Sequence, residues 1–279
     1  MRVRGERECR ECGRHWSYFE TGSVECPTCG SLHSVGTGDR EAHTDAPVDL
    51  DLHEHRQRFG ETTSTLPDEG VTKLKRDLRA YVHKRGFVHA GALTELDTTY
   101  LAARELLEAV DVYDRLRQPT DDDHAYLLAL LAGADNGDRP RAAEIPSAMR
   151  SARGMATALA VETYREALST YLTDSTANTS AYDYADAQAG SSHGRAESDT
   201  APTSMPHQSD PLQRTQLDRL RERLRDRTKQ ITALQGDVDP AVADELVRAT
   251  RAIYVAVTTD DEDAANRADA HLTNAAPSS

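Results

Sequence analysis

The sequence is poor in lysine, in aromatic residues and in long apolar runs. Only four of its 33 basic residues are lysines, against 47 acidic residues, and the formal net charge of the 279 residues is −14. A chain this acidic is not expected to coat nucleic acid. Acidic surfaces with little lysine are typical of cytoplasmic proteins from salt-loving organisms, so we expect a halophilic source.

The absence of long apolar runs excludes membrane-spanning proteins. The longest run, residues 125–132, has eight residues, whereas a membrane-spanning helix needs roughly 18. The opening residues, MRVRGERE, contain no apolar core of a secretory signal. We therefore expect a soluble protein in the reducing cytoplasm, where disulfides are rare.

Motifs of several large enzyme families are missing as well. The sequence has no P-loop, no dinucleotide-binding glycine fingerprint, no nucleophile elbow and no His-Glu-x-x-His pair. Because no catalytic residue can be named, we expect a protein that is not an enzyme.

The four cysteines form the one strong motif. Cys9 and Cys12, and likewise Cys26 and Cys29, are separated by two residues, and each pair is followed by glycine. Each pair can chelate from a tight turn, in which the glycine permits the positive φ that directs backbone N–H groups at the sulfurs. Four thiolates suit tetrahedral Zn²⁺ and leave no position for water. We predict one structural zinc ion that supplies the folding free energy of this unit.

The segment between the cysteine pairs has the pattern of a short hairpin, so residues 1–38 are predicted to form a β zinc ribbon. Strand alternation over residues 14–20 places Trp16 and Tyr18 on one face. An exposed aromatic pair would bind a protein partner or stack on a base. The alternative is that the two rings pack against the ribbon's own turn or against the helical domain.

These residues carry a resemblance to known families. The cysteine turns around a short hairpin resemble the zinc ribbon of transcription factor IIB. The chain as a whole, from RGEREC through WSY to CPTCG, resembles an uncharacterised haloarchaeal zinc-ribbon family with a helical domain of unknown function. By analogy, the ribbon resemblance implies docking on RNA polymerase, although the two cyclin-like repeats of the transcription factor are not evident here.

The cysteine turns also resemble those of rubredoxin and rubrerythrin, which bind iron for electron transfer. Rubrerythrin adds a helical di-iron domain that uses Glu-x-x-His, and no glutamate here stands three residues before a histidine. A di-iron domain is therefore excluded, and iron in the ribbon remains the alternative to zinc.

Apolar residues recur at helical spacing from residue 66 to residue 173, which predicts a bundle of four helices. The first is expected to end at Lys84, with Gly86 in a left-handed terminal position. The third is expected to begin at residues 121–123, whose three carboxylates suit a helix N-terminus.

The last third of the chain changes in composition twice. Residues 174–209 contain no Leu, Ile, Val or Phe, so little burial can offset the entropy of ordering them, and we predict a disordered linker. A leucine-rich seam and the helix start at Asp239-Pro240 then predict a helical hairpin, with a frayed helix after Asp260. Whether the hairpin packs in cis or on another chain stays open.

Two clusters of charged or titratable residues have ordinary explanations. Seven basic residues between Arg214 and Lys229 would suit a phosphate-binding stripe. The acidic residues interleaved with them favour a salt-bridged solvent face instead. Histidines near the cysteines (His15, His33) and in the connector (His43, His53, His55) are expected to be solvated rather than metal ligands.

Together these patterns predict a mainly α protein with a small N-terminal β zinc ribbon, an α-helical bundle and a C-terminal helical hairpin. The favoured function is a zinc-binding, non-enzymatic adaptor that binds a protein partner, and the ribbon resemblance implies a transcription-related partner. A nucleic-acid-binding ribbon and an iron electron-transfer module are the alternatives. The expected segments are a ribbon at 1–38, a connector at 39–65, a bundle at 66–173, a linker at 174–209, a hairpin at 210–273 and a disordered tail at 274–279.

Overall fold

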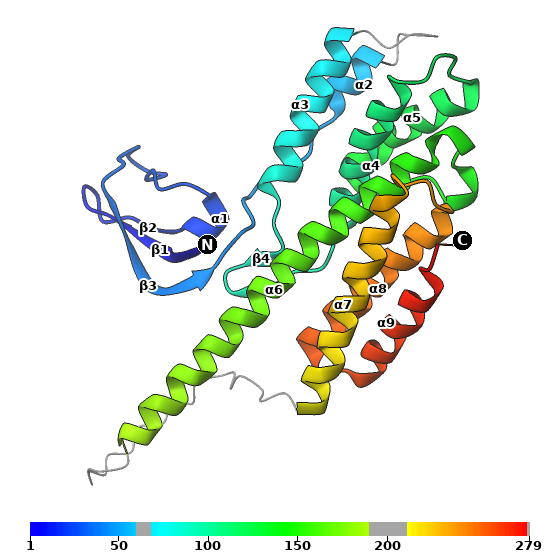
Figure 1. Cartoon of the computed structure of the whole chain (residues 1–279). Coiled ribbons are helices and arrows are strands. Elements are labelled where there is room, and N and C mark those ends of the chain that lie inside the picture. Colours follow the sequence, from blue (N-terminus) through cyan, green and yellow to red (C-terminus); the bar gives the residue numbers. More distant parts are fainter. Residues whose placement is uncertain (60–67, 190–210, 278–279) are drawn as a thin grey trace.

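The computed structural model describes residues 1–59, 68–189 and 211–277. In Figure 1 a small β-sheet unit, coloured blue, stands beside a larger body of helices. The expected mainly α architecture with an N-terminal β unit is therefore confirmed. Within these ranges, none of the helices has the length and apolar character needed to cross a membrane.

The N-terminal unit is an antiparallel sheet in the order β2-β1-β3, formed by β1 (Arg2–Cys9), β2 (His15–Ser17) and β3 (Ser34–Ala42). Strand β2 is shorter than expected because helix α1 (Tyr18–Thr21) begins directly after it. Strand β3 carries the sheet past residue 38 because the first half of β1 pairs with its second half, Arg2 lying opposite Ala42.

Helices make up most of the remaining described chain, with one two-stranded hairpin, β4-β5, between α3 and α4. The elements are α2 (His53–Phe59), α3 (Asp68–Lys84), β4 (Val88–His89), β5 (Ala92–Leu93), α4 (Thr98–Tyr113), α5 (Asp121–Gly133), α6 (Arg150–Ala189), α7 (Pro211–Ala233), α8 (Pro240–Thr259) and α9 (Glu262–Asn274).

Local capping explains where two of these helices begin. At α5 the Thr120 hydroxyl accepts from the Asp123 backbone N–H at 3.2 Å, and the Asp123 carboxylate accepts from the Thr120 N–H at 2.9 Å. At α8 the Asp239 carboxylate accepts from the Ala241 N–H, and Pro240 occupies the first turn. Both helix starts agree with the sequence-based expectation.

The expectation for Gly86 was wrong. This residue is not among the glycines with positive φ. A Cβ at Gly86 would lie 2.4 Å from the carbonyl carbon of Thr44, so glycine is required here because two segments approach each other closely.

The C-terminal helices pack in cis on the first bundle and share one apolar core with it. Helix α6, the long green helix of Figure 1, contacts α4 on one side and α7 and α8 on the other. Its closest approach is at Gly154, where a Cβ would lie 2.1 Å from the carbonyl oxygen of Gly236 in the α7–α8 turn. The first bundle and the hairpin are therefore a single helical body.

The segment after Asp260 is a packed helix rather than the expected frayed one. Helix α9 starts at a cap formed by Asp261, whose carboxylate accepts from the Asp263 N–H at 2.8 Å. It buries an alanine-rich face with one leucine, made of Ala264, Ala265, Ala268 and Leu272. The small side chains allow α9 to lie close to α8. A sequence analysis that looks for large apolar residues therefore misses the buried face of α9.

Helix α6 runs on to Ala189, past residue 173, where the bundle was expected to end. Residues 181–189 read AYDYADAQA, and alanine is the best helix former. Helix propensity alone therefore accounts for a helix in a segment that lacks branched apolar residues. The rest of the expected linker, residues 190–209, lies outside the described part of the chain.

Three of the basic residues of α7 make the following contacts within the chain. Arg221 pairs with Asp218 at 3.1 Å, and Arg223 pairs with Asp269 of α9. Arg227 donates to the carbonyl oxygen of Leu272 at 3.0 Å. These contacts agree with the salt-bridged face and not with a free phosphate-binding stripe.

A buried ionic network ties the two halves of the helical body together. Glu105 on α4 is fully buried, and its Oε2 lies 2.7 Å from Arg153 Nε on α6 and 3.1 Å from Arg139 Nη1. Arg153 Nη1 also lies 2.7 Å from Asp244 Oδ1 on α8. The Tyr126 hydroxyl donates to the other oxygen of Glu105. Three helices are thus joined by charges that have little access to water.

The ribbon is attached to this body through the segment after β3. Backbone hydrogen bonds join Gly91 N to Ala42 O and Thr44 N to Val88 O, both at 2.8 Å. The Asp45 carboxylate accepts two bonds from Arg85, at 2.7 and 2.8 Å. Backbone pairing and a bidentate ion pair therefore fix the ribbon to the β4–β5 hairpin.

Two connector histidines are buried, contrary to the expectation that they are solvated. His55 is 3% exposed and contacts Asp77 at 3.1 Å. His43 is 8% exposed and lies between the rings of Phe19 and His89, with centroids at 4.7 and 5.0 Å. Both side chains therefore pack against other secondary-structure elements and are shielded from solvent.

We predict that Glu105→Ala destabilises the helical body by about 3 to 5 kcal/mol, because Arg153 would be left buried without its carboxylate. The free energy of unfolding, measured by urea denaturation of the whole chain, checks this. Glu222→Ala, which removes an exposed carboxylate 3.1 Å from Arg225, is the matched control and should change it by less than about 1 kcal/mol. Equal effects of the two variants would contradict the role of the network.

We also predict that the attachment of the ribbon weakens in mild acid. His43 Nδ1 accepts from the Ala90 N–H at 3.3 Å, which requires a neutral ring. Burial, and then the neighbouring His89, hold the pKa of His43 below its usual value, while Asp45 opposes this.

Because the pKa is lowered in the folded state, the stability from His43 is present above the unfolded pKa of about 6.5 and is lost as pH falls through the lower folded value. Thermal melts from pH 7.5 to pH 5 should show less acid sensitivity in His43→Gln than in wild type. His33→Gln, at an exposed histidine, should behave as wild type, and an unchanged slope in His43→Gln would refute the prediction.

Candidate metal centre

The structure brings the four cysteine sulfurs together. All four ligand atoms lie within 4.8 Å of one another. The sulfurs of Cys9 and Cys29 are 3.6 Å apart, and so are those of Cys12 and Cys26. A disulfide would need about 2.05 Å, whereas four sulfurs about 2.3 Å from one zinc ion stand about 3.8 Å apart. The spacing therefore fits one tetrahedral metal ion.

The two cysteine turns have the same backbone structure. Gly13 N donates to Cys9 O at 3.0 Å, and Gly30 N donates to Cys26 O at 2.9 Å. Both glycines have a φ of 70°, in the left-handed region that glycine adopts without strain. The role that the sequence assigned to these glycines is therefore confirmed, and two similar turns face each other across one site.

The environment of the sulfurs favours binding of a cation. Burial opposes ionisation of Cys26, yet the backbone N–H groups of Cys29 and Thr28 outweigh it and lower the pKa of Cys26 to about 6. The Ser31 N–H favours the Cys29 thiolate, but burial and the other sulfurs raise the pKa of Cys29 to about 12. The thiolate of Cys26 forms readily, whereas the raised pKa values of Cys12 and Cys29 oppose their ionisation. A positive ion between the sulfurs would favour the thiolate forms.

The only tryptophan closes the inner side of this site. Trp16 is 8% exposed and forms a small core with the buried Cys9 and Cys26. Its indole N–H donates to the carbonyl oxygen of Ser23 at 3.0 Å. The ring of Trp16 therefore packs against the ribbon's own turn and is not part of an exposed aromatic pair.

Tyr18 does not share a face with Trp16. Strand β2 ends at Ser17, and the first turn of α1 redirects Tyr18 toward the helical body, where its ring stands edge-on to His43 at 6.2 Å. Of the two nearby histidines, His15 is exposed and His33 contacts Glu11 at 2.9 Å. Neither belongs to the cluster of sulfurs.

The donor set determines what a bound metal can do. Four thiolates suit a soft or borderline cation such as zinc or iron and complete a tetrahedral shell. A closed shell leaves no position at which the ion could activate water. The site is therefore suited to holding the ribbon together.

Comparison with known proteins gives one match. A family model described as "Family of unknown function (DUF7117)" matches residues 1–272. No curated protein and no solved structure matches the chain.

We predict that Cys26→Ser abolishes metal binding and unfolds the ribbon, while the helical body keeps its far-ultraviolet circular dichroism. The reason is that the ribbon's only other core residues are Trp16 and Cys9, too few to fold a unit of this size without a metal. Trp16 fluorescence reports the ribbon separately, because it is the only tryptophan. Ser31→Ala is the matched control, and retention of native fluorescence in Cys26→Ser would contradict the metal's structural role.

Proposed function

Because the chain belongs to this family of unknown function, we propose its role from its own chemistry: a zinc-binding, non-enzymatic adaptor whose ribbon binds a protein partner. The observation that carries the proposal is the cluster of four cysteine sulfurs, which would fill all four positions around one tetrahedral ion. Such a site shapes a surface and performs no reaction.

Zinc is the metal that we propose. Zinc has no redox chemistry and accepts tetrahedral thiolate coordination without geometric strain. Iron in the same shell would make the ribbon an electron-transfer module, which is the alternative to a structural zinc site. We also propose that the protein works in a saline, reducing cytoplasm. The excess of acidic residues supports the saline part of this proposal, and the free thiols support the reducing part.

The surface of the ribbon supports protein binding. Among the described residues, the large apolar side chains that stand most exposed are Met1, Val24, Leu32 and Leu234. Val24 and Leu32 flank the second cysteine turn, where Cys26 N donates to Ser31 O at 2.9 Å. Their exposed fractions are 43% and 68%. Exposed apolar side chains fixed on a metal-bound turn are suited to the centre of a small protein interface.

Protein is favoured over nucleic acid as the partner. Burial of Trp16 removes the exposed ring that motivated base stacking. The net charge of −14 also opposes phosphate binding. The resemblance to the ribbon of transcription factor IIB makes components of the transcription machinery the first partners to test.

The test is a pull-down with the metal-loaded full chain, followed by rebinding of each recovered partner after purification. We predict that Leu32→Asp weakens rebinding by at least about tenfold, since a charge would replace an apolar contact. Ala241→Asp adds the same charge at an exposed position of the helical body, on α8, and should bind as wild type. Metal content must stay the same in both variants, and equal rebinding by both would contradict a ribbon interface.

A further inference from the structure

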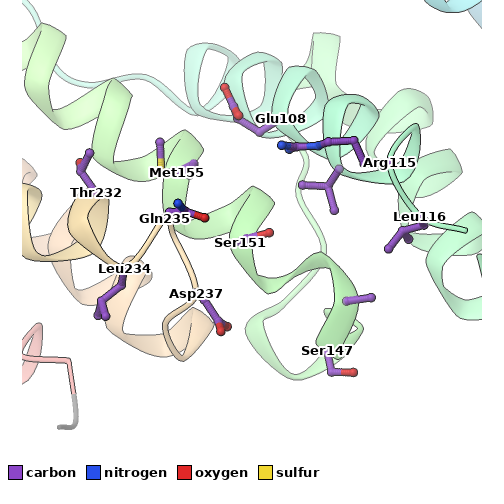
Figure 2. Close-up of a pocket in the computed structure, with 12 residues that line it drawn as sticks. Glu108, Arg115, Leu116, Ser147, Ser151, Met155, Thr232, Leu234, Gln235 and Asp237 are labelled. Carbon is purple, nitrogen blue, oxygen red and sulfur yellow. The ribbon is translucent and has the colours of Figure 1, made fainter.

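The helical body carries charges of both signs close together. Figure 2 shows a hollow of about 730 Å³ that is lined by Glu108 and Arg115 on one side and by Asp237 of the α7–α8 turn on the other. Because both signs are present, the charge of this hollow favours no one class of ligand. In the described part of the chain, every arginine that forms an ion pair lies between Arg56 and Arg267, outside the ribbon.

The arginines of the ribbon differ from those of the helical body. They lie within residues 1–42 and are Arg2, Arg4, Arg7, Arg10, Arg14 and Arg40. Arg7 is half-buried and the others are exposed. Among the described residues, none of them has a carboxylate within the 4.0 Å of an ion pair. In a chain of net charge −14, the ribbon is therefore the part best able to attract an anion.

Three of these residues, Arg2, Arg4 and Arg40, share one face of the sheet, which we call the arginine face. The register of β1 and β3 places Arg4 directly opposite Arg40, and directly opposite side chains lie on the same face with Cβ atoms about 4.5 to 5.5 Å apart. Arg2 stands two residues before Arg4 in β1, so it lies on that face as well. Like charges directly opposite each other are destabilising, so an anion bound between Arg4 and Arg40 would stabilise the sheet.

Backbone carbonyl groups hold two of these side chains against the sheet. Arg4 Nη1 donates to the carbonyl oxygen of Gly38 at 2.6 Å, and Arg2 Nη2 donates to that of Arg40 at 3.2 Å. A guanidinium has five N–H groups, so one bond to a carbonyl oxygen leaves others free for a ligand. A planar guanidinium held in place matches the paired oxygens of a carboxylate or a phosphate. The arginine face is therefore suited to an oxyanion.

The arginine face adjoins the apolar residues of the second cysteine turn. A Cβ at Gly36 would stand 2.9 Å from Arg4 Cβ, and Gly36 lies opposite Arg7 in the register. Arg7 Nε donates to the Ser34 hydroxyl at 3.1 Å, which in turn donates to the carbonyl oxygen of Val24 at 2.6 Å. A continuous series of contacts thus leads from the arginines to Val24, so one partner can reach both.

We propose that the arginine face binds an acidic segment of a protein partner. Carboxylates of that segment pair with Arg4 and Arg40, and an apolar side chain beside them contacts Val24. The exposed apolar side chains next to the face favour a protein segment, and the net charge of −14 opposes a nucleic acid. This inference rests on the ribbon interface proposed above, to which it adds the chemistry of the partner.

The probe is a short fluorescein-labelled synthetic peptide that alternates aspartate and leucine. Its binding to the metal-loaded full chain is measured by fluorescence anisotropy at constant ionic strength. We expect the double variant Arg4→Gln/Arg40→Gln to bind at least about tenfold more weakly than wild type, because both guanidinium groups are lost. Arg4→Lys/Arg40→Lys keeps the charge but not the planar fork and should fall between the two.

The matched control is Arg117→Gln/Arg150→Gln. It removes two exposed arginines of the helical body that have no ion pair within the described residues, and it should bind as wild type. Metal content and Trp16 fluorescence identify variants that keep a folded ribbon. Equal binding by wild type and Arg4→Gln/Arg40→Gln, or no binding of the peptide to wild type, would overturn the inference.

Two further probes test the chemistry of the ligand. The same peptide with asparagine in place of aspartate should bind at least about tenfold more weakly, and equal binding would show that carboxylates are not recognised. A labelled single-stranded oligothymidylate should bind more weakly than the acidic peptide. Tighter binding of the oligonucleotide would replace the acidic protein segment by a phosphate backbone and so overturn the inference.

Failure of this inference can be told apart from failure of the ribbon interface. If Leu32→Asp weakens partner rebinding but the acidic peptide does not bind, the interface stands and the proposed charge of the partner is wrong. If the peptide binds through the arginine face but Leu32→Asp rebinds partners as wild type, the arginine face stands and the apolar interface is wrong.

Discussion

The folding of the N-terminal unit depends on the attraction between four clustered sulfurs and one cation. The ribbon has a three-residue core, of which two members are cysteines, and burial of so little surface cannot offset the entropy of ordering some forty residues. Four thiolates within 4.8 Å of one another repel each other unless a positive ion lies between them. The facing of the two cysteine turns, and the packing of Trp16 against Cys9 and Cys26, depend on that contact.

The ribbon's position on the helices has a different origin. Its attachment combines backbone pairing to the β4–β5 hairpin with the ion pair of Asp45 and Arg85. The helices behind it share one core and the buried network around Glu105. The ribbon and its apolar turn are therefore held against the helices by specific contacts.

The metal ligands and most helices could be predicted from the sequence because short-range rules determine them. The spacing of the cysteine pairs defines the turns, and Asp239-Pro240 defines the start of α8. Two of the predictions that were wrong concern long-range contacts. Gly86 is needed for an approach to Thr44, which no local pattern reveals, and His43 is buried by α1 and by β4, far away in the chain.

Alanine-rich surfaces were the other source of error. Helix α9 packs through alanines, whose small side chains give little hydrophobic signal but allow close approach of helices.

Trp16 and Tyr18 were placed on one face because strand alternation was extended through residue 18, whereas α1 begins there.

X-ray absorption spectroscopy at the metal edge tests the central claim most directly. Protein purified without added chelator should contain one zinc ion per chain with four sulfur neighbours at about 2.3 Å. Nitrogen or oxygen atoms in the first shell, or iron in place of zinc, would contradict a closed, structural zinc site. Either result would mean that the metal of the ribbon can take part in a reaction.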